Sequence, residues 1–371
     1  MRVLVWHWGR RGAGPRFAVE LAAGLASVPG TTALLSLAEG AEILSIPGAP
    51  RCDLLVPTYA GWPGLLARAM AAPVMLARLD RALARLRPDL AVCAMPAVLD
   101  PLFLTTLRRR GIPSLVIAHD AGPHAGDGGW VRAAWDRMVL GQADMLGVLS
   151  GHVGVAIAAA HRVPVLPLWH PPFPMPALPL PRAHGGALRV LSFGRLRAYK
   201  GLELLMATTR QLPRGWDLRV VGAGPETPQL AALRAVPGVW VENRWVAEAD
   251  LPGLLGWADV VLLTHAAASQ SGVAAAAIGA GRFVVATDVG GLAEQTRDVA
   301  GVMLCRPDAD ALVAALHACQ AAPLPVRANP AADWQDMAAE LLAGVRQAGL
   351  AQRQPRAMAA ASCSAVRSGP L

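Results

Sequence analysis

The sequence has few aromatic residues and little charge for its length. Of its 371 residues, 5% are aromatic and 16% are charged, and no basic run is interleaved with aromatic side chains. Proteins that bind nucleic acid strands commonly combine a basic groove with stacking aromatics, so the composition disfavours such a partner. Three interpretations of the net charge of +8 then remain: a solvated basic surface, phosphorylated substrates, or an anionic membrane face.

A long hydrophobic run is also missing. Hydrophobic residues make up 54% of the chain, but Arg, Gly or Pro breaks every run well before the roughly 20 residues that a spanning helix needs. The first residues, MRVLVWHWGRRGAG, lack the apolar core and cleavage site of a signal peptide. We therefore expect a cytoplasmic protein without a membrane span.

The cysteines show neither a pairing pattern nor the spacing of metal ligands. They are Cys52, Cys93, Cys305, Cys319 and Cys363. An odd, scattered set indicates a reducing compartment and predicts no metal site. Cys93 falls in an expected strand, where a buried, small apolar role is the natural interpretation.

What the sequence does contain is a regular alternation of apolar strands with amphipathic helices. In the first half, strands are expected near 2–6, 32–36, 53–57, 89–93, 114–118 and 145–149. The second half repeats the pattern with strands near 188–193, 217–222, 238–242, 259–263, 283–287 and 300–304. Such alternation predicts parallel sheets covered by helices on both faces. The fold class is therefore α/β, with two Rossmann-like domains facing a cleft.

A proline-rich run at 164–186 divides the two halves, because it can form neither a helix nor an inner strand. The domain plan that follows is a first domain at 1–168, a linker at 169–187, a second domain at 188–330, a helix at 332–348 and a tail at 351–371. The tail is rich in Gln, Arg, Ala and Ser, and we expect it to be disordered.

The stretch at 260–298 is the most informative. An apolar strand runs into the polar turn Ser269–Gly272, which opens an alanine-rich helix, and a second apolar strand follows. Parallel sheets bind ligands at the carboxyl ends of their strands, and a helix start turns backbone N–H groups toward anions. We expect a phosphorylated ligand whose diphosphate is held by the N–H groups of Ser271, Gly272 and Val273. Plain helix capping by Ser269 or Ser271 is the alternative.

The segment FGRLRAYKG places two cations at a second strand end. Gly194 and Arg195 follow the strand, and Lys200 opens the next helix. Two cations there suit a departing pyrophosphate, which needs its charge neutralised. An isolated Arg-x4-Lys would be an ordinary basic surface, but its agreement with the SQSG turn favours a functional interpretation.

Two features of the first half point to the same cleft. In HWGRRGAG, Gly12 and Gly14 would allow the backbone to turn tightly and approach a ligand, beside the positive charge of Arg10, Arg11 and Arg16. His119 and Asp120 follow the strand at 114–118, with His124 and Asp127 in the succeeding loop. A satisfied turn histidine is the alternative interpretation of His119.

The segments at 193–205 and 260–298, with VVGAGPE at 220–226, resemble the donor-binding half of GT-B glycosyltransferases, namely the retaining, family 4-like (group 1) enzymes. The resemblance implies a nucleoside-diphosphate-sugar donor, a sugar or lipid-linked sugar acceptor, and no cofactor or required metal. It also implies that Arg195, Lys200 and His119 serve catalysis, and that the last helix crosses back onto the first domain. Glu294 in GGLAEQ would help to bind the donor together with Gly12, Gly14 and Gly194. A structural role at a helix start is the alternative for Glu294. ENRWV at 242–246 would run along the nucleobase.

The chain departs from this family at two positions. Members commonly carry two glutamates eight residues apart, one on the donor sugar and one on the ribose. Here the first falls at Ala268, or at Ala267 by the SQSG spacing, and the second at Ala276. The alternative is therefore a catalytically degenerate paralogue that binds ligand or acts as a partner protein. A sugar-nucleotide epimerase would need converging carboxylates too, and a dehydrogenase would need a complete G-x-G-x-x-G with an acidic ribose ligand.

An anionic membrane surface is a further expected partner, with the enzyme peripheral at the inner membrane face. The expected surface combines the arginines of the first loop, Arg108–Arg110, and the helix at 62–70 with Trp62, Leu65, Leu66 and Met70. Core packing is the alternative for these apolar residues.

Overall fold

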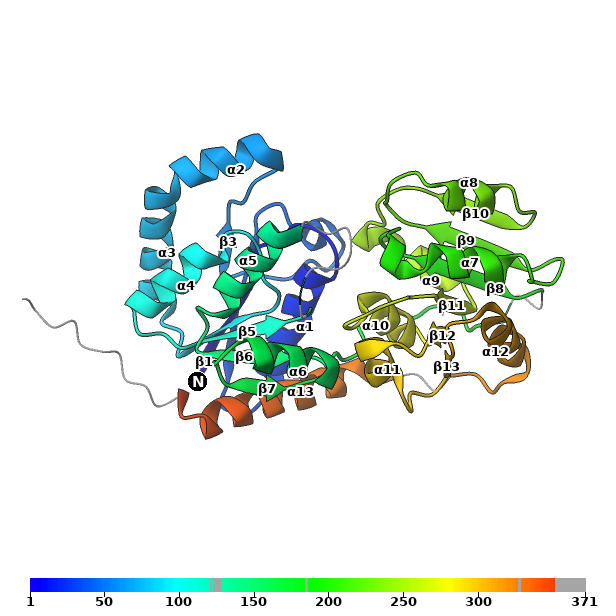
Figure 1. The fold of residues 1–371 in the computed structure, drawn as a ribbon. Coiled ribbons are helices and arrows are strands. Elements are labelled where there is room, and N and C mark those ends of the chain that lie inside the picture. The colour runs from blue at the N-terminus through cyan, green and yellow to red at the C-terminus, as the bar shows by residue number, and fades with distance from the viewer. Residues whose placement is uncertain (121, 123–128, 184–185, 326–327, 351–371) are drawn as a thin grey trace, which may run out of the picture.

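The computed structural model describes residues 1–120, 122, 129–183, 186–325 and 328–350, without the side chains of residues 131 and 132. These residues form two domains, each a parallel sheet with helices on both faces (Figure 1). The expected fold class, α/β with two Rossmann-like domains, is confirmed. The tail at 351–371, and with it Cys363, lies outside the described residues, as do His124 and Asp127.

The first domain contains a seven-stranded sheet in the order β3-β2-β1-β4-β5-β6-β7. Its strands are β1 (Arg2–His7), β2 (Thr32–Ala38), β3 (Leu54–Val56), β4 (Leu90–Cys93), β5 (Ser114–Ala118), β6 (Met145–Val148) and β7 (Val165–Pro167). Its helices are α1 (Ala13–Ser27), η1 (Glu42–Ser45), α2 (Gly61–Met70), α3 (Ala72–Leu86), α4 (Asp100–Arg109), α5 (Gly129–Leu140) and α6 (Gly151–Ala160). β7 was not expected inside the proline-rich run, but it lies at the sheet edge, where a missing N–H is tolerated.

The second domain contains a six-stranded sheet in the order β10-β9-β8-β11-β12-β13. Its strands are β8 (Arg189–Phe193), β9 (Asp217–Val221), β10 (Val239–Glu242), β11 (Val260–Leu263), β12 (Phe283–Thr287) and β13 (Val302–Cys305). Its helices are η2 (Ala198–Lys200), α7 (Leu202–Thr209), α8 (Pro228–Arg234), η3 (Glu248–Asp250), α9 (Leu251–Trp257), α10 (Gly272–Gly279), α11 (Gly290–Thr296) and α12 (Ala309–Ala321). The order in which successive strands are added to the sheet reverses at β1/β4 in the first domain and at β8/β11 in the second. Such switch points are where open parallel sheets bind ligands.

Strand side chains alternate between the two faces of the first sheet. Val3 and Val5 belong to the cluster on the α1 side, whereas Leu4 and Trp6 belong to the opposite cluster. This period of two, with apolar residues on both sides, is what a parallel strand buried between two helix layers requires. Cys93 is fully buried, as expected.

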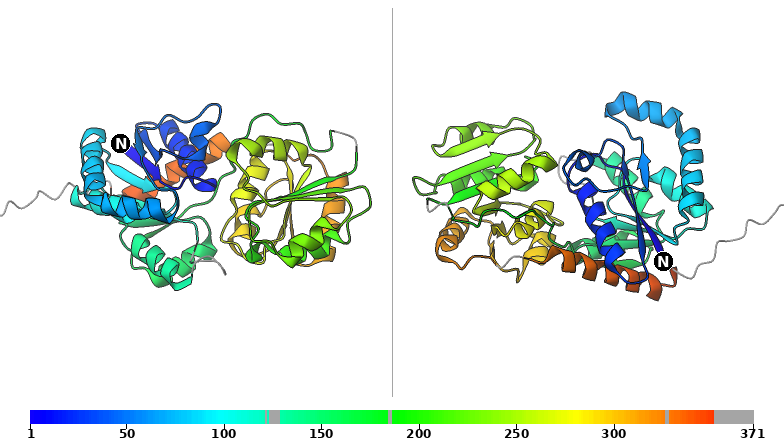
Figure 2. Two further views of the ribbon diagram at one scale, coloured as in Figure 1. Left: turned by 90° about the horizontal axis from the view of Figure 1, so that it is seen from above. Right: turned by 180° about the vertical axis from the view of Figure 1, so that it is seen from behind.

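One more helix joins the domains. α13 (Pro330–Gln347) follows the second domain in sequence but runs along the first, beside α1 (Figures 1 and 2). Trp334 is buried there, with its ring 4.9 Å from that of Phe17 and its indole N–H donating to the carbonyl of Pro172 in the linker at 2.9 Å. The linker is packed as well, since Phe173 is buried and its N–H donates to Ala275 in α10. One apolar cluster therefore continues from α1 through the linker to α10.

Candidate functional site between the domains

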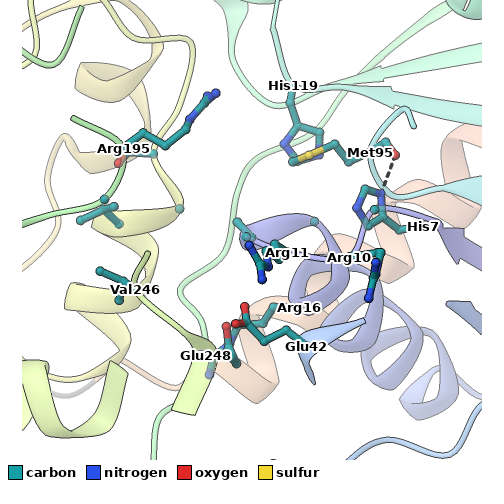
Figure 3. A pocket seen from close by; sticks show the side chains of 18 of the residues that line it. His7, Arg10, Arg11, Arg16, Glu42, Met95, His119, Arg195, Val246 and Glu248 are labelled. Atoms are coloured by element: carbon teal, nitrogen blue, oxygen red, sulfur yellow. Dashed lines mark hydrogen bonds and ion pairs between the residues drawn. The ribbon is translucent and has the colours of Figure 1, made fainter. Parts of the chain in front are cut away.

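A cavity of about 710 Å³ lies between the two domains. Its walls include the loops that follow β1, β4 and β5 in the first domain and β8, β10 and β11 in the second. Figure 3 shows Arg195 on one side, with His119 and Arg11 on the other. The loops at both topological switch points therefore line one cavity. The sequence predicts that the ligand binds at these strand ends.

Lys200 lies on the second-domain wall, held by two loops that are bonded to each other. The carbonyls of Tyr199 and Lys200 accept hydrogen bonds from Ala266 N–H and the Thr264 hydroxyl, both at 2.9 Å. Gly201 has φ +70°, and a Cβ there would stand 1.8 Å from the Thr264 carbonyl oxygen. Only glycine permits this approach, and it fixes Lys200 beside the loop after β11.

The Lys200 side chain is in an unusual electrostatic environment. Its Nζ lies 2.5 Å from His265 Nε2. Burial, and then the neighbouring charge of Arg195, lower the pKa of Lys200 to about 8, while Asp120 opposes the shift. Both Arg195 and Lys200 line the cavity, as predicted for a site that receives a diphosphate. A shared anion would relieve the repulsion between these two cations.

Two helices begin at the cavity and meet there. A Cβ on Gly272, the first residue of α10, would lie 2.9 Å from Ala13 Cβ, the first residue of α1. α1 has no side-chain cap and no acidic residue in its first turn, and its N-cap Gly12 has φ +84°. Since helix N-termini carry partial positive charge, this junction favours an anion.

Ser271 is already occupied by hydrogen bonds within its own domain. Its N–H donates to Gln295 Oε1 at 2.7 Å, its carbonyl accepts from Gln295 Nε2 at 3.2 Å, and its hydroxyl caps α10 by accepting from Ala274 N–H. The capping alternative therefore holds for Ser271. Of the three backbone N–H groups predicted to hold the diphosphate, those of Gly272 and Val273 remain candidates, and both residues line the cavity.

Gly14 makes room for a histidine that sequence analysis did not single out. A Cβ on Gly14 would lie 2.4 Å from His7 Nε2, so its lack of a side chain accommodates the ring of His7. His7 Nδ1 donates to the Met95 carbonyl at 2.7 Å, because a carbonyl oxygen only accepts (Figure 3). Burial lowers the pKa of His7 to about 4. His7 is thus neutral, with Nε2 as its accepting atom; the available signal was its place at the end of β1.

His119 lines the cavity but is held on both sides. Its Nε2 donates to the Ala94 carbonyl at 2.7 Å, and its Nδ1 accepts from Gln270 Nε2 at 2.9 Å across the domain interface. Burial lowers the pKa of His119. The satisfied-histidine alternative describes this arrangement, while the place of His119 in the cavity wall agrees with the functional prediction.

Arg16 and Glu42 line the cavity, but both are bonded to the second domain. Arg16 Nη1 lies 2.5 Å from Glu248 Oε1, and Arg16 Nη2 also donates to the Pro174 carbonyl. The indole N–H of Trp245 donates to the carboxylate of Glu42 at 3.0 Å and 3.1 Å. The charge that Arg16 was expected to offer a ligand is therefore neutralised by Glu248.

Glu294, predicted to bind the donor, contacts another part of the protein. Its carboxylate accepts hydrogen bonds from the N–H groups of Gly151 at 2.5 Å and His152 at 2.9 Å, which begin α6 of the first domain. Glu294 is not among the residues that line the cavity. The structure therefore gives it a structural role, capping a helix of the other domain, and does not bring it to the donor-binding residues.

Of the three alanines predicted to stand where the resembled family has glutamates, Ala268 and Ala276 line the cavity and Ala267 does not. Ala268 is 6% exposed and Ala276 is 3% exposed. In the ENRWV segment, Asn243 exchanges hydrogen bonds with the backbone of Gly224 and so shapes this wall, while Trp245 lines it. Among the described residues, no cluster of His, Cys, Asp and Glu could hold a metal ion.

Residues 187–321 match the sequence model of the family described as glycosyl transferases group 1. No curated protein sequence matches the chain. Solved structures give the fold: HepE of Anabaena in complex with UDP and glucose is 18% identical, with a TM-score of 0.63 over 95% of each chain. Sucrose-phosphate synthase of Thermosynechococcus elongatus is also 18% identical, with a TM-score of 0.65 over 94% of this chain and 99% of that one.

The lipopolysaccharide outer core galactosyltransferase WaaB is 13% identical, with a TM-score of 0.60 over 94% of this chain and 100% of that one. These similarities show the GT-B fold, in which two Rossmann-like domains face a cleft.

Proposed function

We propose that the protein is a glycosyltransferase that moves a sugar from a nucleoside-diphosphate sugar to an acceptor hydroxyl with retention of configuration. The acceptor oxygen forms a bond to the anomeric carbon, and the bond from that carbon to the diphosphate oxygen breaks. The diphosphate leaves with the electron pair and takes up the acceptor proton. Arg195, Lys200 and the N-termini of α1 and α10 stabilise the departing charge, without a protein nucleophile or cofactor.

The placement of Lys200 carries this proposal. It is the only lysine in a sequence that otherwise uses arginine, and it lies beside Arg195 in the wall of the interdomain cavity. A lysine with a lowered pKa, next to a second cation, is more stable when an anion binds between them. The match of residues 187–321 to group 1 glycosyl transferases supports the same assignment.

Calorimetry with UDP, GDP and ADP tests the binding step. We expect at least one of the three to bind, and Lys200→Met to weaken that binding by about 10- to 150-fold, the equivalent of one charge-assisted contact. Arg214→Met, an exposed cation outside the cavity, is the matched control and should bind as the parent does. Equal weakening by both variants, or no binding to any of the three nucleotides, contradicts the proposal.

Turnover separates this function from the degenerate paralogue that Ala268 and Ala276 suggest. Release of nucleoside diphosphate from the sugar donor that binds, followed by NMR of the anomeric proton in the product, reports both activity and configuration. Tight binding without turnover favours the paralogue. Conversion of the donor to its epimer would favour an epimerase. Because the charge is met by side chains and helix ends, chelation with EDTA should leave nucleotide affinity unchanged.

The class of acceptor is suggested by what the similar structures are. WaaB is a lipopolysaccharide galactosyltransferase, and the Anabaena structure holds UDP and glucose. We place the protein in polysaccharide or glycolipid biosynthesis, acting on a sugar or lipid-linked sugar acceptor.

An anionic membrane surface is the partner proposed for helix α2. Trp62, Leu66 and Met70 are 78%, 66% and 87% exposed, so core packing is wrong for these three residues. Leu65 is partly buried and packs against the first domain's core, so core packing holds for it. Exposed arginines follow on α3, at Arg78 and Arg81. An apolar ridge beside basic residues suits an interfacial location. None of the described helices has the length and apolar character needed to cross a membrane.

Arg108 and Arg110 of the expected surface are bonded within the first domain, and Arg110 contacts α3 between Arg78 and Arg81. Arg110 is paired with Asp80 at 2.5 Å, and Arg108 donates to the Gln142 carbonyl at 2.8 Å. These residues end α4, which runs back from the carboxyl edge of the sheet, so they lie at the edge away from the cavity.

Sedimentation with anionic liposomes at low salt tests the membrane surface. The double variant Trp62→Ser, Leu66→Ser should lose binding, whereas Leu180→Ser, Leu324→Ser should retain it, since that pair is exposed but lies outside the first domain's ridge. If both double variants bind equally, α2 is not the contact.

A further inference from the structure

Gln270 reaches from the second domain to the first. It lies between β11 and α10, and its side-chain Nε2 donates to His119 Nδ1 at 2.9 Å. The roles of the two atoms are fixed, because His119 Nε2 already donates to the Ala94 carbonyl. In a neutral imidazole the other nitrogen must then accept. The amide N–H₂ of Gln270 therefore faces the histidine.

This orientation leaves the amide oxygen of Gln270 without a partner. Oε1 is buried and makes no hydrogen bond with any part of the protein that the structure describes. Exchanging the two amide atoms would not help, because the oxygen would then face the accepting Nδ1 of His119. Buried amide oxygens almost always have a donor, so an exception on a residue that lines a cavity is a candidate contact for a bound group.

The backbone around Gln270 is fixed on both sides. The carbonyl of Ser269 accepts from the Ser150 hydroxyl of the first domain at 3.2 Å. On the other side, Gln295 bonds to both the N–H and the carbonyl of Ser271. The position of the Gln270 side chain in the cavity wall is therefore built into the fold and does not depend on a free loop.

No carboxylate stands at the two alanine positions beside it. Ala268 precedes Gln270 by two residues and Ala276 follows it in α10, and both line the same cavity. Gln270 lines the cavity beside them, and its Oε1 is a side-chain acceptor left without a partner in this part of the wall. As an amide oxygen it is neutral and can only accept.

We propose that Gln270 Oε1 accepts a hydrogen bond from the sugar of the donor, taking over the contact for which the alanines provide no carboxylate. The sugar group that it contacts is a hydrogen-bond donor, either a hydroxyl or the N–H of an acylamino substituent. It is not a sugar carboxylate. This inference rests on the proposed function and concerns the sugar half of the donor alone.

The test compares each nucleotide with its sugar ester, using UDP with UDP-glucose, GDP with GDP-mannose, and ADP with ADP-glucose. For the pair that the parent binds, Gln270→Ala should leave the affinity for the nucleotide unchanged. It should weaken the affinity for the sugar ester by about tenfold, the equivalent of one hydrogen bond. Gln211→Ala, an exposed glutamine outside the cavity, is the matched control.

A second variant separates contact with the sugar from bracing of His119. Gln270→Glu keeps an oxygen that can accept from the sugar but loses the N–H₂ that holds His119. We expect it to retain the difference in affinity between sugar ester and nucleotide. The inference is overturned if Gln270→Glu loses this difference in affinity as fully as Gln270→Ala does. It is also overturned if Gln270→Ala keeps the difference. In both cases nucleotide binding would still support the proposed function. If the parent binds none of the three nucleotides, both fall.

Discussion

The two walls of the cavity differ in how well short sequence motifs predict the contacts of their side chains. On the second-domain wall, Arg195, Lys200 and Gly272 all belong to short motifs at strand ends, and each lines the cavity as the motifs predict. On the first-domain wall, Arg16 and His119 also come from recognisable loops, but their side chains bond to the opposite domain. Position at a strand end is enough to predict that a residue lies in the cavity wall. Whether its side chain is available to a ligand depends on the hydrogen bonds and ion pairs that the side chain makes.

The difference reflects how each wall is fixed. Hydrogen bonds and a glycine contact within the second domain hold much of the second-domain wall, such as those that join Lys200 and Gly201 to Thr264. The first-domain wall is held by contacts such as Arg16 with Glu248 and Trp245 with Glu42, which join residues more than 200 positions apart. We therefore expect changes to the first wall to act mainly through stability and closure, and changes to the second to act through ligand affinity.

Removal of the Trp334 side chain should have the largest effect, and this effect should be on stability. Its ring is buried against Phe17 of the first domain although it comes from the end of the described chain. We expect Trp334→Ala to lower the free energy of unfolding by about 3–5 kcal/mol through the cavity that it leaves. Chemical denaturation followed by circular dichroism measures this change. Trp240→Ala, at an exposed position on β10, is the control and should cost far less.

The free energy of unfolding should depend on pH through the charge state of Glu20, which lies on α1 of the first domain. Burial, with a contribution from Glu248 and against the opposing charge of Arg16, raises the pKa of Glu20 from 4.5 to about 7. The folded state then holds the proton more tightly than the unfolded state. The corresponding stability is complete below pH 4.5 and is lost as pH rises through about 7, a change of about 3 kcal/mol.

Unfolding free energies of Glu20→Gln and the parent across this pH range measure the effect. The variant should lack the decrease that Glu20 causes, whereas Glu340→Gln, at an exposed position on α13, should follow the parent. Parallel curves for Glu20→Gln and the parent would show that this carboxyl titrates normally in the fold.

For the second-domain wall, pH should act on ligand affinity. Since the pKa of Lys200 is about 8, its protonated fraction falls as pH rises through that value. We expect nucleoside diphosphate affinity to fall by about tenfold between pH 7 and pH 9, equivalent to about 1.4 kcal/mol. Calorimetry measures this dependence, which Lys200→Met should lack. Because Lys200 is the sole lysine, reductive ¹³C-methylation gives one side-chain NMR signal for a direct titration; a midpoint near 10.5 would contradict the burial argument.

The smallest expected effect comes from restoring an acid in the cavity. Ala276 lines a space of about 710 Å³, which has room for a longer side chain. We expect Ala276→Glu to tighten nucleotide binding by about 1 kcal/mol through a hydrogen bond to the ribose. Weaker binding by a folded Ala276→Glu, measured by the same calorimetry, would show that the ribose lies elsewhere in the cavity.

Much of the fold could be predicted because its signals are local. Apolar runs such as Val260–Leu263 identify buried parallel strands, and the turn at Ser269–Gly272 identifies the helix start that follows. Lys200 carried a further signal in being the only lysine of the chain. Such features depend on neighbours in sequence, and the structure places them as those neighbours require.

The sequence by itself determined the two α/β domains, the strand ends that line the cavity and the cations of the second-domain wall. Only the tertiary structure decided that Glu294 caps α6, that Gly14 makes room for His7, and that Gln270 holds His119 while its own oxygen lacks a partner. The reason is physical: backbone turns and strand periodicity are set by adjacent residues, whereas the hydrogen-bonding partner of a buried polar group is whichever group the packed domains bring within about 3 Å.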